Sequence, residues 1–337
     1  MKKILITGAC GFVGTNFIKS LITNSKENYY IIGIDNLSHG TFIPKIHAHN
    51  GKRVKVKTYK TDIRNANIDR HFEDVDYVFH FAGLVSIYDC DKNHYDALDN
   101  NILRSVNVLD SCVRHKVKKI IVMETSAVYE DCGEPPYNET QSNPRTMYAT
   151  SKAMLASLVK SYKKLYNLDY TLLRPFNIYG EFQDWKRTVP PASAGFAIRI
   201  MQNKRPIVFG DIERKRDFIH VDDIIKFLNI CLTSEQTRNQ TFNLGTGVSH
   251  SLREMILLIH DILGTDYTGY IQQDEINGEA FDIHANIDKA LSIGWKPDIS
   301  FRFGHEKLIF YLKDLFNAGT FPKDFMDNLN IEQLKIK

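Results

Sequence analysis

The sequence predicts an α/β protein with a doubly wound parallel sheet, followed by a smaller mixed α/β lobe. Short β-branched runs alternate with longer helical patterns through the first half of the chain, as in repeated βαβ units. This regularity ends after Pro175, and a stretch containing several prolines and glycines follows from Asn177 to Gly210. A chain of 337 residues also exceeds the usual size of one hydrophobic core, which favours a second lobe.

The strands and helices of the first half follow from β-branched runs and from helical spacing of apolar residues. The predicted strands are Lys3 to Thr7, Tyr30 to Ile34, Arg53 to Tyr59, Tyr77 to His80, Lys119 to Met123 and Tyr170 to Arg174. The longest predicted helices are Tyr95 to His115 and Pro144 to Tyr166, and the second half has helical patterns at Asp222 to Leu232 and Leu252 to Leu263. We expect a sheet domain over residues 1–175, to which later segments return, a second lobe over 176–325 and a polar tail over 326–337.

Composition excludes several classes of function. The net charge of +3 is spread along the chain, so neither nucleic acid nor a membrane is a predicted partner. Five cysteines without CxxC or Cys/His spacing predict neither a disulfide framework nor a zinc site, and the histidines show no HExxH pattern. No metal is therefore expected. The apolar run after Met1-Lys2-Lys3 is too short for a signal peptide, so we expect a cytoplasmic protein.

The first predicted strand runs directly into a glycine-rich turn. Its sequence is Gly8-Ala9-Cys10-Gly11-Phe12-Val13-Gly14, and a predicted helix follows from Thr15 to Thr23. A glycine at the strand exit permits the tight turn, the next lets a pyrophosphate approach backbone N–H groups, and the third allows close packing of helix on strand. A glycine trio alone could be an ordinary turn, but the strand before it and the helix after it indicate a Rossmann-type dinucleotide site.

An acidic residue closes the second strand. The Asp35 carboxylate can accept hydrogen bonds from a ribose 2′-hydroxyl and would repel the 2′-phosphate of NADP, so NAD is the expected cofactor. The alternative is an exposed carboxylate at a strand end.

A tyrosine and a lysine are four residues apart in the predicted helix that begins at Pro144. Tyr148 and Lys152 therefore lie on one helix face. A phenol has a pKa of about 10, and a nearby cation can lower it by about 1 to 3 units, which would let Tyr148 act as a base. By itself such a pair is more often an exposed amphipathic contact than a catalytic one.

Several further motifs occur in order and give the chain a family resemblance. Over about residues 2 to 300 it resembles the nucleotide-sugar epimerase and dehydratase branch of the extended short-chain dehydrogenase/reductases. The matching motifs are Thr7 to Gly14, Asp35 to Ser38, Asp62-Ile63, His80 to Gly83, Asn101, Glu124 to Tyr129, Tyr148 to Lys152, Leu173 to Gly180 and Arg216 to Asp223.

The resemblance implies a role for each motif. Tyr148 is the general base and acid, Lys152 binds the nicotinamide ribose and tunes Tyr148, and Thr125 donates a hydrogen bond to the reacting oxygen. The residues implied to bind NAD are Gly8, Gly11, Phe12, Val13, Gly14, Asp35, Asn36, Asp62, Ile63, Ala82, Gly83, Asn101, Tyr148 and Lys152. Those implied to bind the nucleotide sugar are Ser86, Thr125, Ser126, Asn177 and Arg216, the last as a diphosphate clamp. Each could instead be a loop or strand residue without such a role.

The residues after Thr125 bear on the reaction. Family members that eliminate water carry an Asp-Glu pair there, whereas this chain has Ser126 and Ala127, neither of which can transfer protons in that way. What remains is oxidation at C4 of the sugar and return of the hydride to the other face, which is 4-epimerisation. A net dehydrogenase, a keto-sugar reductase or a decarboxylase of a nucleotide-linked uronic acid would use the same site. A non-catalytic dinucleotide sensor is an alternative of another class.

The chain also departs from the family pattern. Many relatives have an Arg before Pro-Gly-Asp/Glu near the carboxyl end, where this chain has Ile276-Asn277-Gly278-Glu279. Gly83 replaces a usual Ala, and Glu130 a usual Gly. The resemblance further implies a homodimer formed by Tyr95 to His115 and Pro144 to Tyr166. An apolar stripe fits this interface or a sheet-facing helix side: Leu98, Ile102, Val106, Leu109 and Val113.

Overall fold

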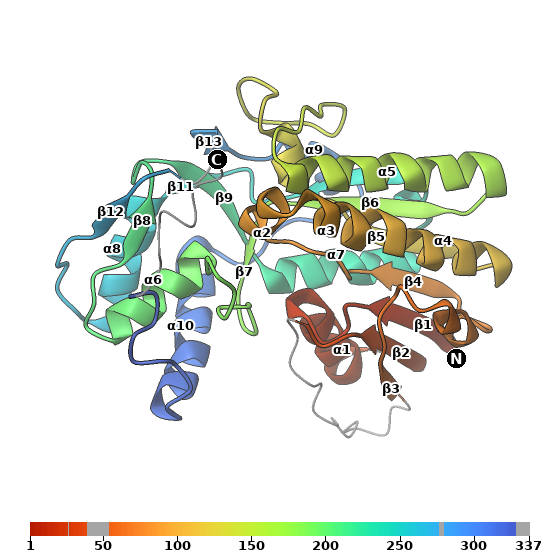
Figure 1. Cartoon of the computed structure of the whole chain (residues 1–337), viewed down its shortest axis with the longest axis horizontal. Coiled ribbons are helices and arrows are strands. Elements are labelled where there is room, and N and C mark those ends of the chain that lie inside the picture. Colours follow the sequence, from red (N-terminus) through yellow and green to blue (C-terminus); the bar gives the residue numbers. More distant parts are fainter. Residues whose placement is uncertain (26, 39–53, 276–279, 328–337) are drawn as a thin grey trace.

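A central sheet of seven parallel strands organises the molecule (Figure 1). The computed structural model describes residues 1–25, 27–38, 54–275 and 280–327. The strand order is β10-β6-β5-β4-β1-β2-β3, so the chain winds outward from β1 in one direction and then in the other. The bounds are β1 Lys2–Thr7, β2 Tyr29–Asp35, β3 Lys55–Lys60, β4 Tyr77–His80, β5 Lys119–Met123, β6 Tyr170–Pro175 and β10 Gln240–Leu244. The predicted doubly wound Rossmann-type sheet is confirmed, with β10 as a strand that the sequence analysis did not assign.

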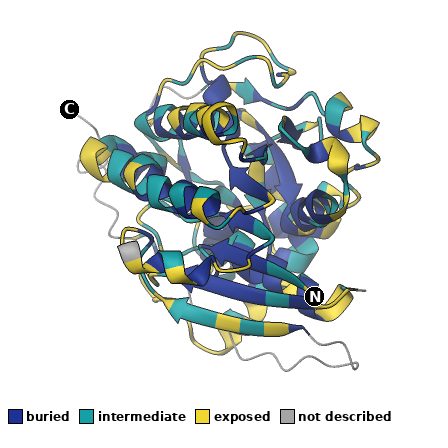
Figure 2. Cartoon of the chain, turned by 90° about the vertical axis from the view of Figure 1, so that its right-hand side faces the viewer, coloured by how far each residue is buried: buried dark blue, intermediate teal, exposed yellow. Residues whose placement is uncertain are grey.

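Helices cover both faces of this sheet. On one face of the sheet, α1 (Phe12–Asn24) and α7 (Val221–Thr233) pack with residues of β1 in one apolar core. On the opposite face, α4 (Arg104–Arg114) and α5 (Met147–Tyr166) share a second core. Figure 2 shows the buried strands between helices whose outer sides are exposed. The inner strands, such as β1 and β5, are buried on both faces, which explains their nearly continuous apolar sequences, whereas the edge strand β3 is partly exposed.

Two predicted helices differ in detail from the structure. The segment predicted as one helix from Tyr95 to His115 consists of α3 (His94–Leu98), a π-helical turn (Asp99–Leu103) and α4. The helix predicted from Pro144 begins at Met147, because the Glu130 carboxylate accepts hydrogen bonds from the N–H groups of Arg145 and Thr146 and holds them outside the helix. Both deviations depend on contacts with distant segments.

The second lobe is mixed α/β, as predicted. Its helices are α6 (Ala192–Met201), α8 (Leu252–Leu263) and α10 (Phe301–Asn317), which pack together around a third apolar core. Its short strands form one four-stranded and one two-stranded sheet. They are β7 Asn177–Tyr179, β8 Ile207–Phe209, β9 Lys215–His220, β11 Ser249–Ser251, β12 Ile271–Gln273 and β13 Asp282–Ile283.

Short helices complete the described chain, and none of its helices is long and apolar enough to cross a membrane. They are η1 Ala66–His71, α2 Ile87–Lys92, η3 Ser126–Tyr129, η4 Glu235–Thr237 and α9 Asp288–Ser292. At the start of the predicted polar tail, the Asp327 carboxylate pairs with Arg199 and Lys204. Residues 328–337, the departure at 276–279 and the predicted strand residue Arg53 lie outside the described residues.

Candidate active site

A cavity of about 610 Å³ lies between the carboxyl ends of the sheet strands and the second lobe. A side pocket of about 330 Å³ adjoins it, and both are lined by Ser86, Thr125, Tyr148, Asn177, Arg187 and Arg216. Most of the residues predicted to bind cofactor or substrate line the larger cavity; they are Gly8, Gly11, Phe12, Val13, Gly14, Asp35, Asn36, Asp62, Ile63, Ala82, Gly83, Ser86, Thr125, Tyr148, Lys152, Asn177 and Arg216. Asn101 and Ser126 lie elsewhere.

The glycine-rich turn forms a cradle at one end of the cavity. Gly8 has a φ of +68°, and a Cβ there would lie 2.7 Å from the backbone nitrogen of Ala82. A Cβ on Gly14 would lie 2.3 Å from the carbonyl oxygen of Gly8, so only glycine lets α1 approach the turn this closely. Gly11 caps α1 without a side-chain acceptor, and the first turn carries no acidic residue. The first N–H groups of α1 are therefore suited to a pyrophosphate.

An acidic cluster borders the cavity beside this cradle. The two oxygens of Asp35 accept hydrogen bonds from the N–H groups of Cys10 (2.9 Å) and Leu37 (2.7 Å), and each oxygen can accept another. Burial alone would raise the pKa of Asp62, but hydrogen bonds from Arg64 and Asn36 and the charge of Arg104 lower it. Carboxylates at the end of β2 and after β3 suit a ribose and an adenine better than an additional phosphate.

The segment that follows β4 is held by hydrogen bonds from a buried side chain that does not line the cavity. Asn101 lies under it: its side-chain oxygen accepts from the Leu84 N–H (2.8 Å), and its amide donates to the Leu84 carbonyl (3.0 Å) and to Ser151 of α5 (2.9 Å). A Cβ on Gly83 would lie 2.8 Å from that side-chain oxygen, which explains glycine at this position. Asn101, predicted to bind NAD, thus holds the turn that lines the cavity, and the π-helical turn places it there.

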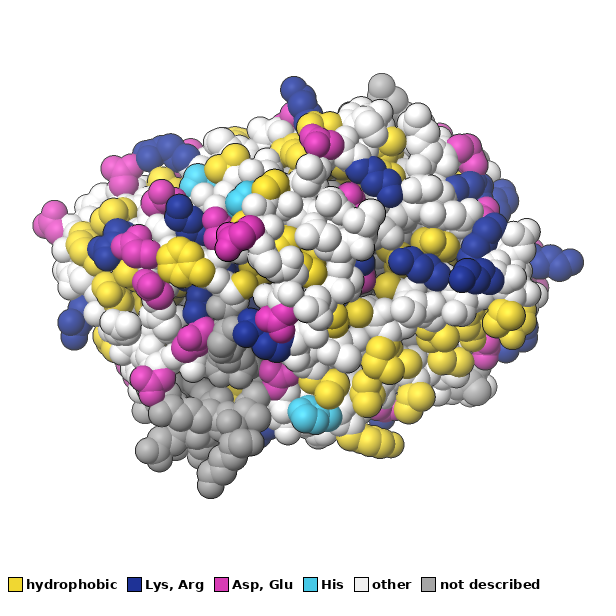
Figure 3. Space-filling model, turned by 90° about the horizontal axis from the view of Figure 1, so that it is seen from above, with side chains coloured by type: hydrophobic (Ala, Val, Ile, Leu, Met, Phe, Trp, Pro, Cys, Tyr) yellow, Lys and Arg dark blue, Asp and Glu magenta, His cyan; other side chains and the backbone are white. Residues whose placement is uncertain are grey.

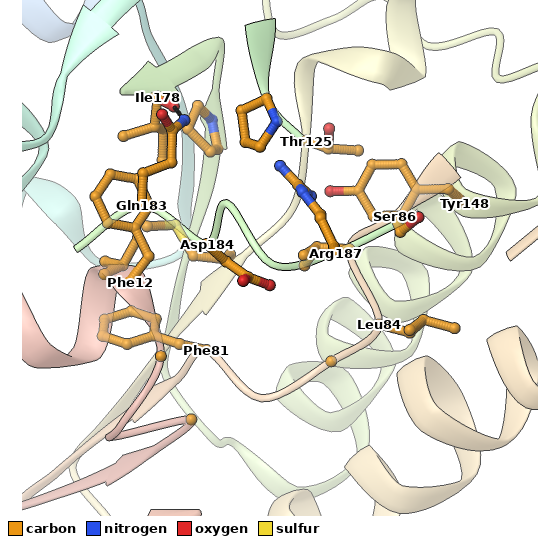
Figure 4. Close-up of a pocket in the computed structure, with 18 of the residues that line it drawn as sticks. Phe12, Phe81, Leu84, Ser86, Thr125, Tyr148, Ile178, Gln183, Asp184 and Arg187 are labelled. Carbon is orange, nitrogen blue, oxygen red and sulfur yellow. Dashed lines mark hydrogen bonds between the residues drawn. The ribbon is translucent and has the colours of Figure 1, made fainter. Parts of the chain in front are cut away.

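Tyr148 and Thr125 come together in the centre of the cavity (Figure 4). Burial raises the pKa of Tyr148 to about 12, while a hydrogen bond with Thr125 and the charge of Arg187 act in the opposite direction. Lys152 donates from Nζ to the Met123 carbonyl (3.0 Å), and burial lowers its pKa to about 8. The charge of Arg187 thus favours the Tyr148 phenolate, and the same role for Lys152 stays a prediction.

The predicted substrate residues lie on the lobe side of Tyr148. Ser86 caps α2 by accepting from the Asp89 N–H (3.2 Å), and Ser126 lines the side pocket but not the larger cavity. Asn177 begins β7. Arg216 is buried in β9 and donates from Nη1 to the carbonyls of Lys215 (2.7 Å) and Ala280 (2.9 Å), so it does not belong to a solvated basic loop.

The sequence analysis did not identify several cavity residues. Gln183, Asp184 and Arg187 lie between β7 and α6, in a stretch predicted only as irregular (Figure 4). Arg214 is buried and also lines the cavity. The charged Lys186-Arg187 pair after Trp185 was the available signal, but nothing in its spacing distinguishes an inward cation from an exposed one.

Known proteins match the chain along most of its length. A model of the NAD dependent epimerase/dehydratase family matches residues 4–245. A putative UDP-glucose 4-epimerase of Methanocaldococcus jannaschii is 32% identical over 320 residues, covering 92% of this chain and 98% of the relative.

Solved structures agree with the sequence relatives. A UDP-N-acetylglucosamine 4-epimerase of Methanobrevibacter ruminantium, in complex with UDP-N-acetylmuramic acid, superposes with a TM-score of 0.85 at 29% identity, over 93% of this chain and 98% of that chain. A UDP-glucuronic acid 4-epimerase of Bacillus cereus, in complex with UDP-glucuronic acid and NAD, has a TM-score of 0.81 at 26% identity, over 93% and 99%. The chain therefore belongs to the NAD-dependent epimerase/dehydratase family, and its cofactor is NAD.

Proposed function

We propose that the protein is a nucleotide-sugar 4-epimerase. It would oxidise C4 of the sugar to a 4-keto group and return the hydride to the opposite face of the ring. The observation that carries this proposal is the convergence of Tyr148 and Thr125 in a cavity that runs from the glycine cradle to Arg216. Its chemistry needs one proton-transferring group at C4, and Tyr148 is suitably placed.

Proton transfer falls to the chain's own residues. As the phenolate, the form that the charge of Arg187 favours, Tyr148 accepts the proton of the C4 hydroxyl as the carbonyl forms. It returns the proton after the sugar has turned over. Thr125 donates a hydrogen bond to the reacting oxygen. The hydrogen bond from Lys152 to the Met123 carbonyl fixes the position of the lysine. NAD supplies the hydride acceptor and donor when it is bound. Because the hydride is returned, the cofactor ends each turnover in its starting form.

The acidic residues near Thr125 are engaged elsewhere, which disfavours elimination of water. Glu124 forms a buried ion pair with Arg174 (2.5 Å). Glu130 accepts hydrogen bonds from the N–H groups of Arg145 and Thr146 and from the Thr146 hydroxyl. Ser126 and Ala127 occupy the positions where the dehydratases carry their acids.

We further propose a division of labour between the two halves of the chain. Residues 1–175, with the returning strand β10, hold NAD, whereas residues 176–325 hold the nucleotide sugar. Arg216 and Asn177 would grip the diphosphate, because a guanidinium fork matches phosphate oxygens and both residues line the cavity and its side pocket. A grip on the nucleotide leaves the sugar free to rotate.

The decisive experiment is an assay without added cofactor. Purified protein is incubated with UDP-glucose, UDP-galactose, their N-acetyl forms, and GDP and CDP sugars, and products are followed by NMR together with NADH absorbance. We expect a C4 epimer without net NADH. Tyr148→Phe keeps the ring but removes the proton-transferring group, so we expect kcat to fall by about 10²- to 10⁴-fold. Accumulated NADH, or a product that has lost water or carbon dioxide, would contradict epimerisation.

A homodimer is the assembly that we propose. The predicted stripe runs over α3, the π-helical turn and α4, and three of its residues face the sheet: Leu109 is buried, and Ile102 and Val113 pack against the same core. Other apolar side chains nevertheless protrude from α3, the π-helical turn and α5, which lie next to one another: Tyr95 is 74% exposed, Leu103 57%, Met154 46% and Leu165 71%. Their burial against a second copy would stabilise the assembly.

Light scattering after gel filtration tests this interface. We expect the wild-type mass to be twice that of the chain, and Leu103→Glu or Met154→Glu to give monomers. Phe310→Glu is the control, because Phe310 is 71% exposed on α10, far from these helices (Figure 1). A monomeric wild-type protein would refute the dimer.

The cytoplasm is the compartment that we propose. None of the five cysteines, all of which lie in the described residues, forms a disulfide, and four of them are buried. Acidic and basic side chains are interspersed on the face shown in Figure 3, without a continuous basic stripe.

A further inference from the structure

A guanidinium with unused hydrogen-bonding capacity lies beside the reacting position. Arg187 lines both the main cavity and its side pocket. Its Nε is sealed from solvent and has no hydrogen-bond partner in the described chain. Because an unpaired buried donor costs free energy, this atom points to an acceptor that a ligand supplies.

The side pocket has the charge that an anion requires. Arg187 and Arg216 line it together with one acidic residue, Glu130. The Glu130 oxygens already accept three hydrogen bonds, from Arg145 and Thr146. Asp184 and Asp89, whose charges also act on Arg187, line the main cavity but not the side pocket. The side pocket therefore offers two cations to a bound group.

The position of Arg187 indicates which part of a sugar it would meet. In Figure 4 the Tyr148 hydroxyl points toward the Arg187 guanidinium. If Tyr148 marks the C4 hydroxyl, the group that meets Arg187 is carried by a neighbouring ring carbon. C3 and C5 are these neighbours, and C5 carries the sixth carbon of a hexose. The planar fork of arginine matches a carboxylate with two parallel hydrogen bonds.

We propose that Arg187 pairs with a carboxylate carried next to the reacting carbon, so that the preferred substrates are nucleotide-linked acidic sugars. This inference rests on the proposed C4 chemistry for its placement. The carboxylate can be C6 of a uronic acid or part of an acidic ether on C3. If Arg187 served only to favour the Tyr148 phenolate, its replacement would instead reduce the turnover of acidic and neutral sugars alike.

The test compares two sugars in two forms of the NAD-loaded enzyme. Affinity by calorimetry and kcat/KM are measured for UDP-glucuronic acid and UDP-glucose with wild type and Arg187→Met. We expect the variant to lose at least about tenfold in affinity and kcat/KM for UDP-glucuronic acid, and less than about threefold for UDP-glucose. Arg187→Lys should recover part of the loss. Lys186→Met is the control, because this neighbouring cation is exposed. It should leave the affinity and kcat/KM for both sugars unchanged.

Each outcome decides the proposal. The proposal would be overturned if Arg187→Met lost affinity for UDP-glucose as much as for the acidic sugars. It would also be overturned if the wild-type enzyme preferred neither UDP-glucuronic acid nor UDP-N-acetylmuramic acid over UDP-glucose. UDP-N-acetylmuramic acid distinguishes the two ring positions of the carboxylate. If Arg187→Met loses affinity for this probe alone, the carboxylate is carried on C3; if it loses affinity for UDP-glucuronic acid, the carboxylate is carried on C5. If neither sugar is epimerised, the proposed function fails, but the comparison of affinities still decides the role of Arg187.

Discussion

At the scale of single residues, burial opposes the charged forms of both the tyrosine and the lysine of the site. Burial raises the pKa of Tyr148 to about 12 and lowers that of Lys152 to about 8. The residue types and their spacing on one helix were evident from the sequence. Their environment was not, because it arises from Thr125, Arg187 and the Met123 carbonyl, which come from other segments.

The low pKa of Lys152 predicts a pH-dependent stability. Below pH 8 the lysine is charged in both states, and the folded chain bears the full cost of burying the charge. Between pH 8 and 10.5, the ordinary pKa of a lysine, the unfolded chain binds a proton that the folded chain does not, so stability rises with pH. Lys152→Met lacks this dependence. Thermal unfolding of the NAD-free proteins should show the variant gaining a few degrees over wild type at pH 7, with the gain vanishing toward pH 10.

The matched control is Lys160→Met, because Lys160 is exposed on the same helix. Its unfolding temperature should equal that of the wild type at every pH. Tyr148 stays protonated throughout this range, since its pKa is about 12, and does not disturb the comparison. A difference between wild type and Lys152→Met that stays constant with pH would show that the lysine is not buried as a cation.

At the scale of elements, close backbone approaches determine where cofactor groups can lie. The glycine turn brings α1 onto the end of β1, and the π-helical turn between α3 and α4 places Asn101 under the Gly83-Leu84 backbone. The sequence predicted the first arrangement because its residues are contiguous. It did not predict the second, because helical periodicity continues through the turn and only the contact with Leu84 reveals the irregularity.

Gly14→Ala tests the first of these approaches. The added Cβ would meet backbone atoms of Gly8 and Ala9 at 2.3 and 2.9 Å, so α1 must move away from the cradle. We expect a loss of about 1 to 3 kcal/mol in stability and at least tenfold weaker NAD binding, measured by thermal unfolding and calorimetry. Gly195→Ala in α6 is the control, since its Cβ would make only ordinary 3.6 Å contacts. Unchanged NAD affinity in Gly14→Ala would argue against the cradle.

At the scale of the whole molecule, the two halves build one cavity from opposite sides. Sheet residues such as Asp35 line one part, and lobe residues such as Arg216 line another. This arrangement predicts that NAD and the nucleotide bind at separable subsites. The chain returns from the second lobe to the sheet, where β10 pairs with β6 at the edge, so the backbone connects the lobe to the sheet a second time.

Ligand-induced stabilisation tests this separation. A ligand at 100 times its Kd stabilises the folded state by about 2.7 kcal/mol, so NAD and UDP should each raise the unfolding temperature. Arg216→Met should abolish most of the UDP shift and keep the NAD shift, each measured against the variant's own baseline. Lys215→Met, at the exposed neighbouring position, should keep both. A UDP shift that survives in Arg216→Met would refute the diphosphate clamp.

The sequence by itself determined the fold class, the glycine turn, the acidic residue that ends β2 and the pairing of Tyr148 with Lys152. These features are local, because each depends on residues within one βαβ unit or one helix face. Only the tertiary structure decided that Arg187 faces Tyr148, that Asn101 supports a turn and that Arg216 is buried in a cavity wall. Their roles depend on segments that are distant along the chain, and no periodicity or spacing within one segment encodes which way such side chains point.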